Sequence, residues 1–123
     1  MSAFPELQVE RHDLVPVVTL SGDVDITIAS ELRTALLGAV DNSDPGLVVD
    51  LSGVRYLDSA GVNLLFELAD SLGVRRLAFA LVLPGGGLVE RVITLVDLGS
   101  VARIERTMEE AVAFVEAGGA PEA

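Results

Sequence analysis

The sequence contains no cysteine, no lysine and only one histidine. Without cysteine the chain forms no disulfide and carries no thiolate nucleophile, and one histidine is too few for the usual zinc sites. Aromatic residues make up 4% of the chain, whereas 50% of its residues are hydrophobic. The core must therefore consist mostly of Val, Leu, Ile and Ala, a composition that suits a sheet packed by helices.

Basic residues are scarce, with 8 arginines against 19 acidic residues and a formal net charge of −11. Such a charge opposes close approach to phosphate backbones, so direct nucleic-acid binding is not expected. The longest apolar run, residues 77–83, is far below the roughly 20 residues that a membrane span needs. We therefore expect a soluble, cytoplasmic protein. The length of the chain is that of one domain, which we expect over residues 1–117, followed by a disordered tail over 118–123.

One stretch, residues 46–72, organises the chain. Residues 47–51 form an apolar, β-branched run, which predicts a buried strand. Later apolar residues recur at three- and four-residue spacing and predict a helix that begins near Asp58 or Ser59. They are Leu64, Leu65, Leu68, Ala69 and Leu72. Ser59 is thus expected at a helix N-terminus, where unpaired N–H groups accept a hydroxyl, a carboxylate or a phosphate.

Two interpretations of this helix start remain open. Asp58 or Ser59 is a plain N-cap, which is the usual role of both residue types at such a position. Alternatively, Ser59 is a modification site whose phosphate the helix N-terminus tolerates. Gly61 fits both interpretations, because it lets another surface approach the first turn, although glycine costs about 1 kcal/mol of helix stability relative to Ala.

Residues 48–62 (VVDLSGVRYLDSAGV) resemble the signature of STAS domains of the anti-sigma factor antagonist family, in which an Asp-Ser-x-Gly motif carries the regulatory phosphoserine. Residues 22–33 are similar to the family's first strand end and first helix. Residues 98–100 (LGS) precede a late strand and a Glu-Glu-Ala helix, again as in the family. Together these segments span about residues 5–117.

The resemblance implies that an anti-sigma factor serine kinase phosphorylates Ser59 and that a phosphoserine phosphatase reverses the mark. Asp58 matches the acidic residue beside the serine, and Asp23 and Asp25 match the acidic pair at the first strand-to-helix turn. Two positions depart from the family pattern: Asp23 stands where Glu is usual, and Ala60 replaces a second hydroxyl residue. Ser59 is consequently the only hydroxyl residue in the motif.

The partner-binding surface is expected to extend along one stripe of the helix. Val62 and Phe66 would offer apolar contacts, although a wide buried helix face explains them equally well. Asp23 and Asp25 would form an acidic rim near Ser59 or would serve only turn and cap chemistry. The expected partner-binding residues are Asp23, Asp25, Asp58, Ser59, Gly61, Val62, Asn63 and Phe66.

The other segments predict the rest of an α/β domain. Residues 7–11 and 14–20 indicate a hairpin with His12 in its turn, and Pro16 places the second strand at or near an edge or at a bulge. Further strands are expected at 77–83 and 101–104. Helices are expected at 28–40 with Thr27 as N-cap, at 88–95, and at 107–116 with a capping box. The prediction is a STAS-like single domain with a mixed β-sheet of four to five strands packed by about four helices.

The predicted function is that of an anti-sigma factor antagonist. Without phosphate the protein would bind an anti-sigma factor kinase and so release the sigma factor. Phosphorylation adds nearly two negative charges, and a partner surface fitted to a neutral hydroxyl would reject them. The alternative is a STAS scaffold or regulatory subunit of a transporter or of a multi-protein signalling complex.

The chain is not expected to be an enzyme. Ser59 lacks the glycine that precedes a hydrolase nucleophile by two residues, and the only histidine, His12, lies in the first turn. No metal or cofactor is expected, because ATP and Mg²⁺ would be held by the partner kinase.

Overall fold

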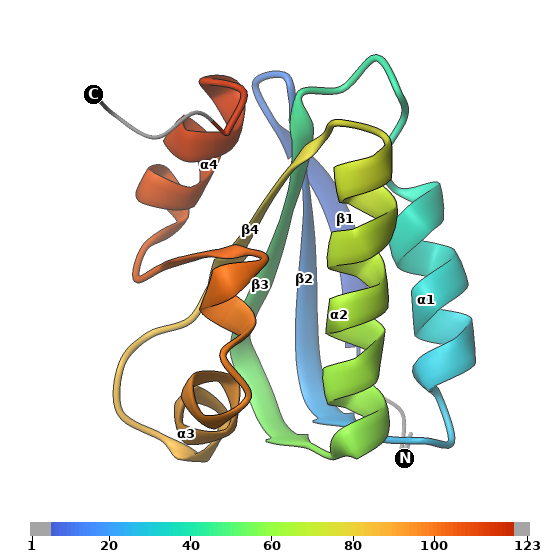
Figure 1. Ribbon diagram of the computed structural model, residues 1–123, viewed down its shortest axis with the longest axis vertical. Helices are drawn as coiled ribbons and strands as arrows, with labels where there is room; N and C mark the ends of the chain where they lie inside the picture. Colours follow the sequence, from blue (N-terminus) through green and yellow to red (C-terminus); the bar gives the residue numbers. More distant parts are fainter. Residues whose placement is uncertain (1–5, 120–123) are drawn as a thin grey trace.

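The computed structural model describes residues 6–119, which form one mixed β-sheet with helices on both faces (Figure 1). The strand order is β1-β2-β3-β4-β5, in which β1 is antiparallel to β2 and all other neighbours are parallel. The elements are β1 (Glu6–His12), β2 (Val15–Val24), α1 (Ala29–Gly38), β3 (Gly46–Leu57), α2 (Ser59–Val74), β4 (Ala78–Val82), α3 (Leu88–Leu95), the 3₁₀ turn η1 (Leu98–Ser100), β5 (Arg103–Glu105) and α4 (Met108–Glu116). The predicted α/β architecture is confirmed.

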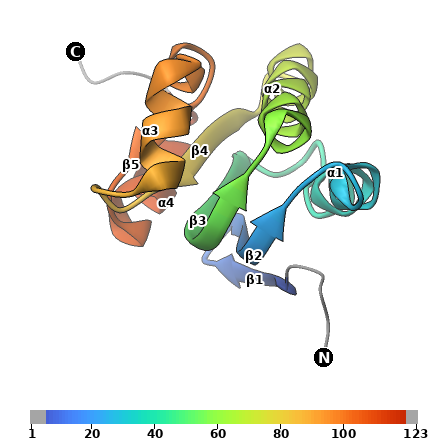
Figure 2. The ribbon, with the colours of Figure 1, turned by 90° about the horizontal axis from the view of Figure 1, so that it is seen from below.

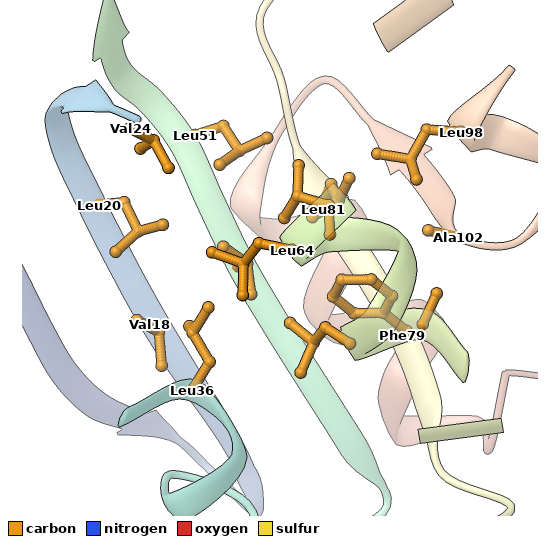
Figure 3. Packing of buried hydrophobic residues seen from close by; sticks show 14 of the residues in the cluster. Val18, Leu20, Val24, Leu36, Leu51, Leu64, Phe79, Leu81, Leu98 and Ala102 are labelled. Carbon is orange, nitrogen blue, oxygen red and sulfur yellow. The ribbon is translucent and has the colours of Figure 1, made fainter. Parts of the chain in front are cut away.

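The two faces of the sheet carry different numbers of helices. Helices α1, α2 and α3 cover one face, and α4 packs on the other (Figure 2). On the first face, Leu36 and Leu64 from the helices meet Leu20, Leu51 and Leu81 from the strands (Figure 3). The opposite face is sealed by a smaller group of buried residues: Val15, Val17, Val48, Ala80, Val82, Ala111, Val112 and Val115.

Strand β3 is longer than the sequence predicted. Its first half is buried on both faces, as the apolar run at 47–51 indicated. Beyond residue 51 it continues to Leu57 and pairs with β2 alone, since pairing with β4 ends at Asp50 and Val82. The second half contains Ser, Gly and Arg and buries only Val54 and Leu57, so it lacked the continuous apolar pattern of a central strand.

Three local predictions were wrong. Thr27 does not cap α1: its N–H and hydroxyl both bind the side chain of Asp25, and Ile28 is the N-cap residue instead. His12 ends β1, because it pairs with Val15 and leaves only residues 13–14 for the turn. The last strand begins two residues later than expected, at Arg103, because η1 and the turn after it occupy residues 98–102.

Other local predictions were confirmed. Helix α3 spans residues 88–95, and the capping box of α4 forms between Thr107 and Glu110. Strand β2 lies next to the edge strand, and its pairing with β3 begins only at Val17, so Pro16 interrupts no hydrogen bond of that ladder.

Two further observations concern the tail and the helices. Gly118 and Gly119 form the turn that closes α4, whereas residues 120–123 of the expected tail lie outside the described residues. Among the helices within residues 6–119, none is both long and apolar enough to cross a membrane.

Candidate partner-binding site

The carboxyl ends of β2, β3 and β4 lie at one end of the sheet, where the chain passes into α1, α2 and α3 (Figure 1, lower end). Loops that follow parallel strands gather at such an end, which is where α/β proteins commonly place their binding sites. Ser59 is the first residue of α2 at this end, and its side chain is exposed.

Asp58, and not Ser59, caps α2. One carboxylate oxygen, Oδ1, accepts a hydrogen bond of 3.0 Å from the Gly61 N–H, which is the N-cap interaction. The other, Oδ2, accepts one of 3.2 Å from the Ile26 N–H in the loop after β2. The Asp58 N–H in turn donates to the carbonyl of Val24 at 3.2 Å. Asp58 therefore holds two adjacent loops together.

The Ser59 hydroxyl takes no part in this arrangement. Within the described part of the chain no hydrogen bond to Ser59 Oγ is found, and the first turn is closed by Asp58 instead. Asp58 is thus the N-cap residue, and the side chain of Ser59 remains available to another molecule.

The acidic pair lies at the same end of the sheet. Asp23 is half-exposed near the end of β2 and contacts Arg55 at 3.5 Å. Asp25 accepts a hydrogen bond of 3.0 Å from the Thr27 N–H, so its side chain stabilises the turn after β2, which is one of the two roles that the sequence allowed for it. Both carboxylates stay partly accessible and, together with Asp58, make this end acidic.

The other expected contact residues divide into buried and exposed ones. Val62 is 9% exposed and belongs to the core, and Phe66 packs against that core. Gly61 is buried, and a Cβ at this position would lie 2.6 Å from Leu57 Cδ1 and 2.9 Å from the Val24 carbonyl oxygen. The close approach at Gly61 is therefore made by the ends of the protein's own β2 and β3. Asn63 is exposed.

Two exposed apolar residues at this end were missed by the sequence analysis. Ile26 is 75% exposed in the loop that binds Asp58, and Tyr56 is 47% exposed three residues before Ser59. Ile26 lines a groove of about 300 Å³ between α1 and α2, together with Ala60 and Asn63. The available signal was an apolar residue directly after the acidic pair, at a position where a turn is ordinarily polar.

The described residues of this site offer a binding surface. Within residues 6–119, no group of three or more potential ligand side chains is placed to hold a metal ion. The site combines an exposed hydroxyl, an acidic rim and an exposed isoleucine beside a groove. Exposed groups of this kind beside a groove are typical of a surface that binds another protein.

Comparisons with known proteins agree with this geometry. The family described as "Mlab, STAS domain" matches residues 7–104. The anti-sigma-F factor antagonist RsfB of Mycobacterium tuberculosis is 30% identical over 110 residues, which cover 89% of this chain and 88% of RsfB. The crystal structure of an anti-sigma factor antagonist from Mycobacterium paratuberculosis superimposes with a TM-score of 0.83 at 33% identity, over 94% of this chain and 97% of that one.

A more distant structure supports the fold alone. The Bacillus cell fate determinant SpoIIAA in its phosphorylated form matches with a TM-score of 0.61 at 22% identity, over 89% of this chain and 99% of that one. From the family match and the RsfB alignment, the chain belongs to the STAS domain proteins of the anti-sigma factor antagonist family. Members of this family are binding modules and not enzymes, and their partners are anti-sigma factors.

Proposed function

We propose that this protein is a phosphorylation-controlled antagonist in which Ser59 is the switch. Unphosphorylated, it binds an anti-sigma factor serine kinase in the cytoplasm and releases the sigma factor. The proposal rests on one observation at the start of α2. Asp58 makes the N-cap hydrogen bond, and the adjacent Ser59 is exposed, with no hydrogen bond found for its hydroxyl within residues 6–119.

A phosphate on Ser59 would alter the surface and leave the fold intact. The N-terminus of a 16-residue helix favours added negative charge, and no buried group has to move to accommodate it. The phosphate would add negative charge next to Asp58, at the end of the sheet that also carries Asp23 and Asp25. A partner shaped for the neutral hydroxyl would then be repelled by charge and excluded by bulk.

The residues of the site have different roles in this proposal. Asn63 and Ile26 line the groove between α1 and α2, and Ser59 is exposed next to Ala60 of the same groove. These three exposed residues make direct contact with the partner. Gly61 and Val62 are buried and act by holding α2 against the sheet. Ile26 supplies the exposed apolar side chain that a protein interface uses as an anchor.

The phosphoryl chemistry belongs to the partners. The kinase would bind ATP and Mg²⁺, and a phosphoserine phosphatase would restore the hydroxyl. This chain contributes the acceptor oxygen and the surface that each of them recognises.

The decisive experiment is incubation with ATP and each candidate anti-sigma kinase of the host, followed by intact-mass analysis and site mapping. Wild type is compared with Ser59→Ala and with Ser30→Ala, which removes another exposed serine close to the same groove. We expect one phosphate that is absent only from Ser59→Ala. A folded wild type that no kinase phosphorylates, yet that is recovered from its host in a stable assembly, would replace this proposal with the scaffold function.

Binding measurements complete the test. Ser59→Ala should bind the kinase about as well as wild type, since the hydroxyl makes no internal bond. Ser59→Glu should bind at least about tenfold more weakly, corresponding to roughly 1.4 kcal/mol. Its thermal midpoint should stay close to that of wild type, and a large drop would show that Ser59 is needed for folding.

A further inference from the structure

A second groove lies at the end of the sheet opposite Ser59, where α2 ends and β4 begins (Figure 1, upper end). It measures about 430 Å³. Its floor is the start of β4, one wall is the segment from Gly99 to Arg103, and the other wall is the end of α4 with Phe114. None of these residues takes part in the Ser59 site.

The sheet is incomplete at this groove. Strand β4 begins at Ala78, but its pairing with β5 begins only at Ala80 and Arg103. On that side of β4, the register leaves Ala78 and Phe79 without a paired residue in the described part of the chain, and the Ala78 N–H donates instead to the Pro45 carbonyl on the β3 side. The Ala78 backbone is therefore committed to β3, and the start of β4 lines the groove without offering a free edge for a further strand.

The charge of the groove is opposite to that of the protein as a whole. The chain carries a formal net charge of −11, yet among residues 6–119 the groove is lined by Arg76 and Arg103 and by no Asp or Glu. Arg76 is exposed, and within residues 6–119 no ion pair is found for it. Two guanidinium groups collected in one place attract carboxylates in a geometry that permits paired hydrogen bonds.

The position of Arg103 is set by two neighbours. Its guanidinium carbon lies 5.1 Å from the centre of the Phe114 ring, and its Nε lies 3.3 Å from a carboxylate oxygen of Glu105. The ring contact holds the guanidinium on the groove wall, and the single Nε contact leaves its remaining N–H groups for a ligand. Val101, which is 48% exposed, adds an apolar contact on the same wall.

We propose that this groove binds an extended, acidic segment of a partner protein. Carboxylates of the segment pair with Arg76 and Arg103, and an apolar side chain between them rests on Phe114 and Val101. The repulsion expected from the overall charge is screened over about 8 Å at physiological ionic strength, so the local arginines decide the contact.

The test is an NMR titration of ¹⁵N-labelled full-length protein at physiological ionic strength with the capped peptide Asp-Leu-Asp-Leu-Asp. The matched control peptide is Asn-Leu-Asn-Leu-Asn, which keeps the shape and removes the charge. We expect saturable shifts concentrated at the amides of Phe79, Gly99, Val101 and Gly118, and much weaker binding of the control peptide. Absence of saturable shifts, or shifts spread over the whole surface, would overturn the proposal.

Substitutions of single residues test whether the acidic peptide binds in this groove. Arg76→Gln alters an exposed side chain for which no ion pair is found within residues 6–119, and it should weaken binding at least about tenfold. Arg91→Gln, which alters an exposed arginine on α3, should not weaken binding. Ser59→Glu should bind the acidic peptide as wild type does, which separates this groove from the Ser59 site. If the Arg76→Gln variant binds as tightly as wild type, the groove is not the site.

Discussion

The side chain of Asp58 and the backbone N–H of Ile26 are joined by a 3.2 Å hydrogen bond across two loops that are 32 residues apart in the sequence. Because the other oxygen of the same carboxylate caps α2, the start of the helix and the loop after β2 are held as one unit. The position of the exposed Ile26 side chain relative to Ser59 therefore depends on Asp58. Substitutions at Asp58, Ser59 and Ile26 distinguish this support from direct binding.

Replacing Asp58 should destabilise the protein. Asp58→Ala removes the N-cap and leaves the N–H groups of Gly61 and Ile26 without their acceptor, so we expect a loss of about 1–2 kcal/mol in the free energy of unfolding. Urea denaturation followed by circular dichroism measures this loss. Ser59→Ala is the control and should stay within about 0.5 kcal/mol of wild type. Equal losses for the two variants would mean that Ser59 shares the cap.

Replacing glycine by alanine should change the stability of the protein in opposite directions at two positions of α2. At Gly61, a new methyl group would press on Leu57 and on the Val24 carbonyl, so Gly61→Ala should cost about 1–3 kcal/mol despite the higher helix propensity of Ala. At Gly73 no atom lies within 4 Å of the new Cβ, so Gly73→Ala should stabilise by up to about 1 kcal/mol. Thermal unfolding of both variants tests the difference, and a stabilising Gly61→Ala would contradict the packing described for β2 and α2.

Ile26 should matter for binding and not for folding. Ile26→Ser removes an apolar side chain that is 75% exposed, so the unfolding midpoint should hardly change. If Ile26 is an anchor of the interface, affinity for the anti-sigma factor should fall by about tenfold or more. Val74→Ser is the matched control, because Val74 is 78% exposed at the far end of α2. Calorimetric titration of wild type, Ile26→Ser and Val74→Ser with the anti-sigma factor measures the three affinities. Equal affinities would show that Ile26 is not part of the interface.

Acid stability should depend on the ion pair between Arg11 and Asp44, which joins β1 to the loop after α1 at 3.0 Å. Burial by itself raises the pKa of Asp44. The Asp41 N–H and the Arg11 guanidinium outweigh burial and leave this pKa below its ordinary value. Since the folded pKa is the lower one, the contribution of Asp44 is fully present above the unfolded pKa of about 3.9. It is lost as the pH falls through the folded value.

The variant Asp44→Asn should therefore be less stable than wild type near neutral pH, and the difference should shrink as the pH falls below about 4. Denaturation midpoints measured from pH 7 to pH 3 test this expectation. Asp70→Asn, at an exposed position of α2, should follow wild type throughout. A difference between Asp44→Asn and wild type that stays constant with pH would show that packing, and not charge, is the contribution of Asp44.

The alternation of strands and helices was predictable from local patterns. The apolar run at 47–51, the helical spacing from Leu64 to Leu72 and the capping box at Thr107 each depend on neighbours within a few residues. The second half of β3 was not predictable in this way, because residues 52–57 are held by a single neighbouring strand and have only two buried positions.

The sequence alone therefore determined the α/β class, the start of a helix near Asp58 or Ser59 and the resemblance of its motif to the antagonist family. These depend on periodicity, capping preferences and residue order, all of which are local. Only the tertiary structure decided that Asp58 is the cap and that Gly61 faces β2. It also decided that Ile26 lies exposed beside the Ser59 helix and that Arg76 and Arg103 share a groove. Each of these facts depends on contacts between segments far apart in the chain, and such contacts exist only once the sheet has brought the segments together.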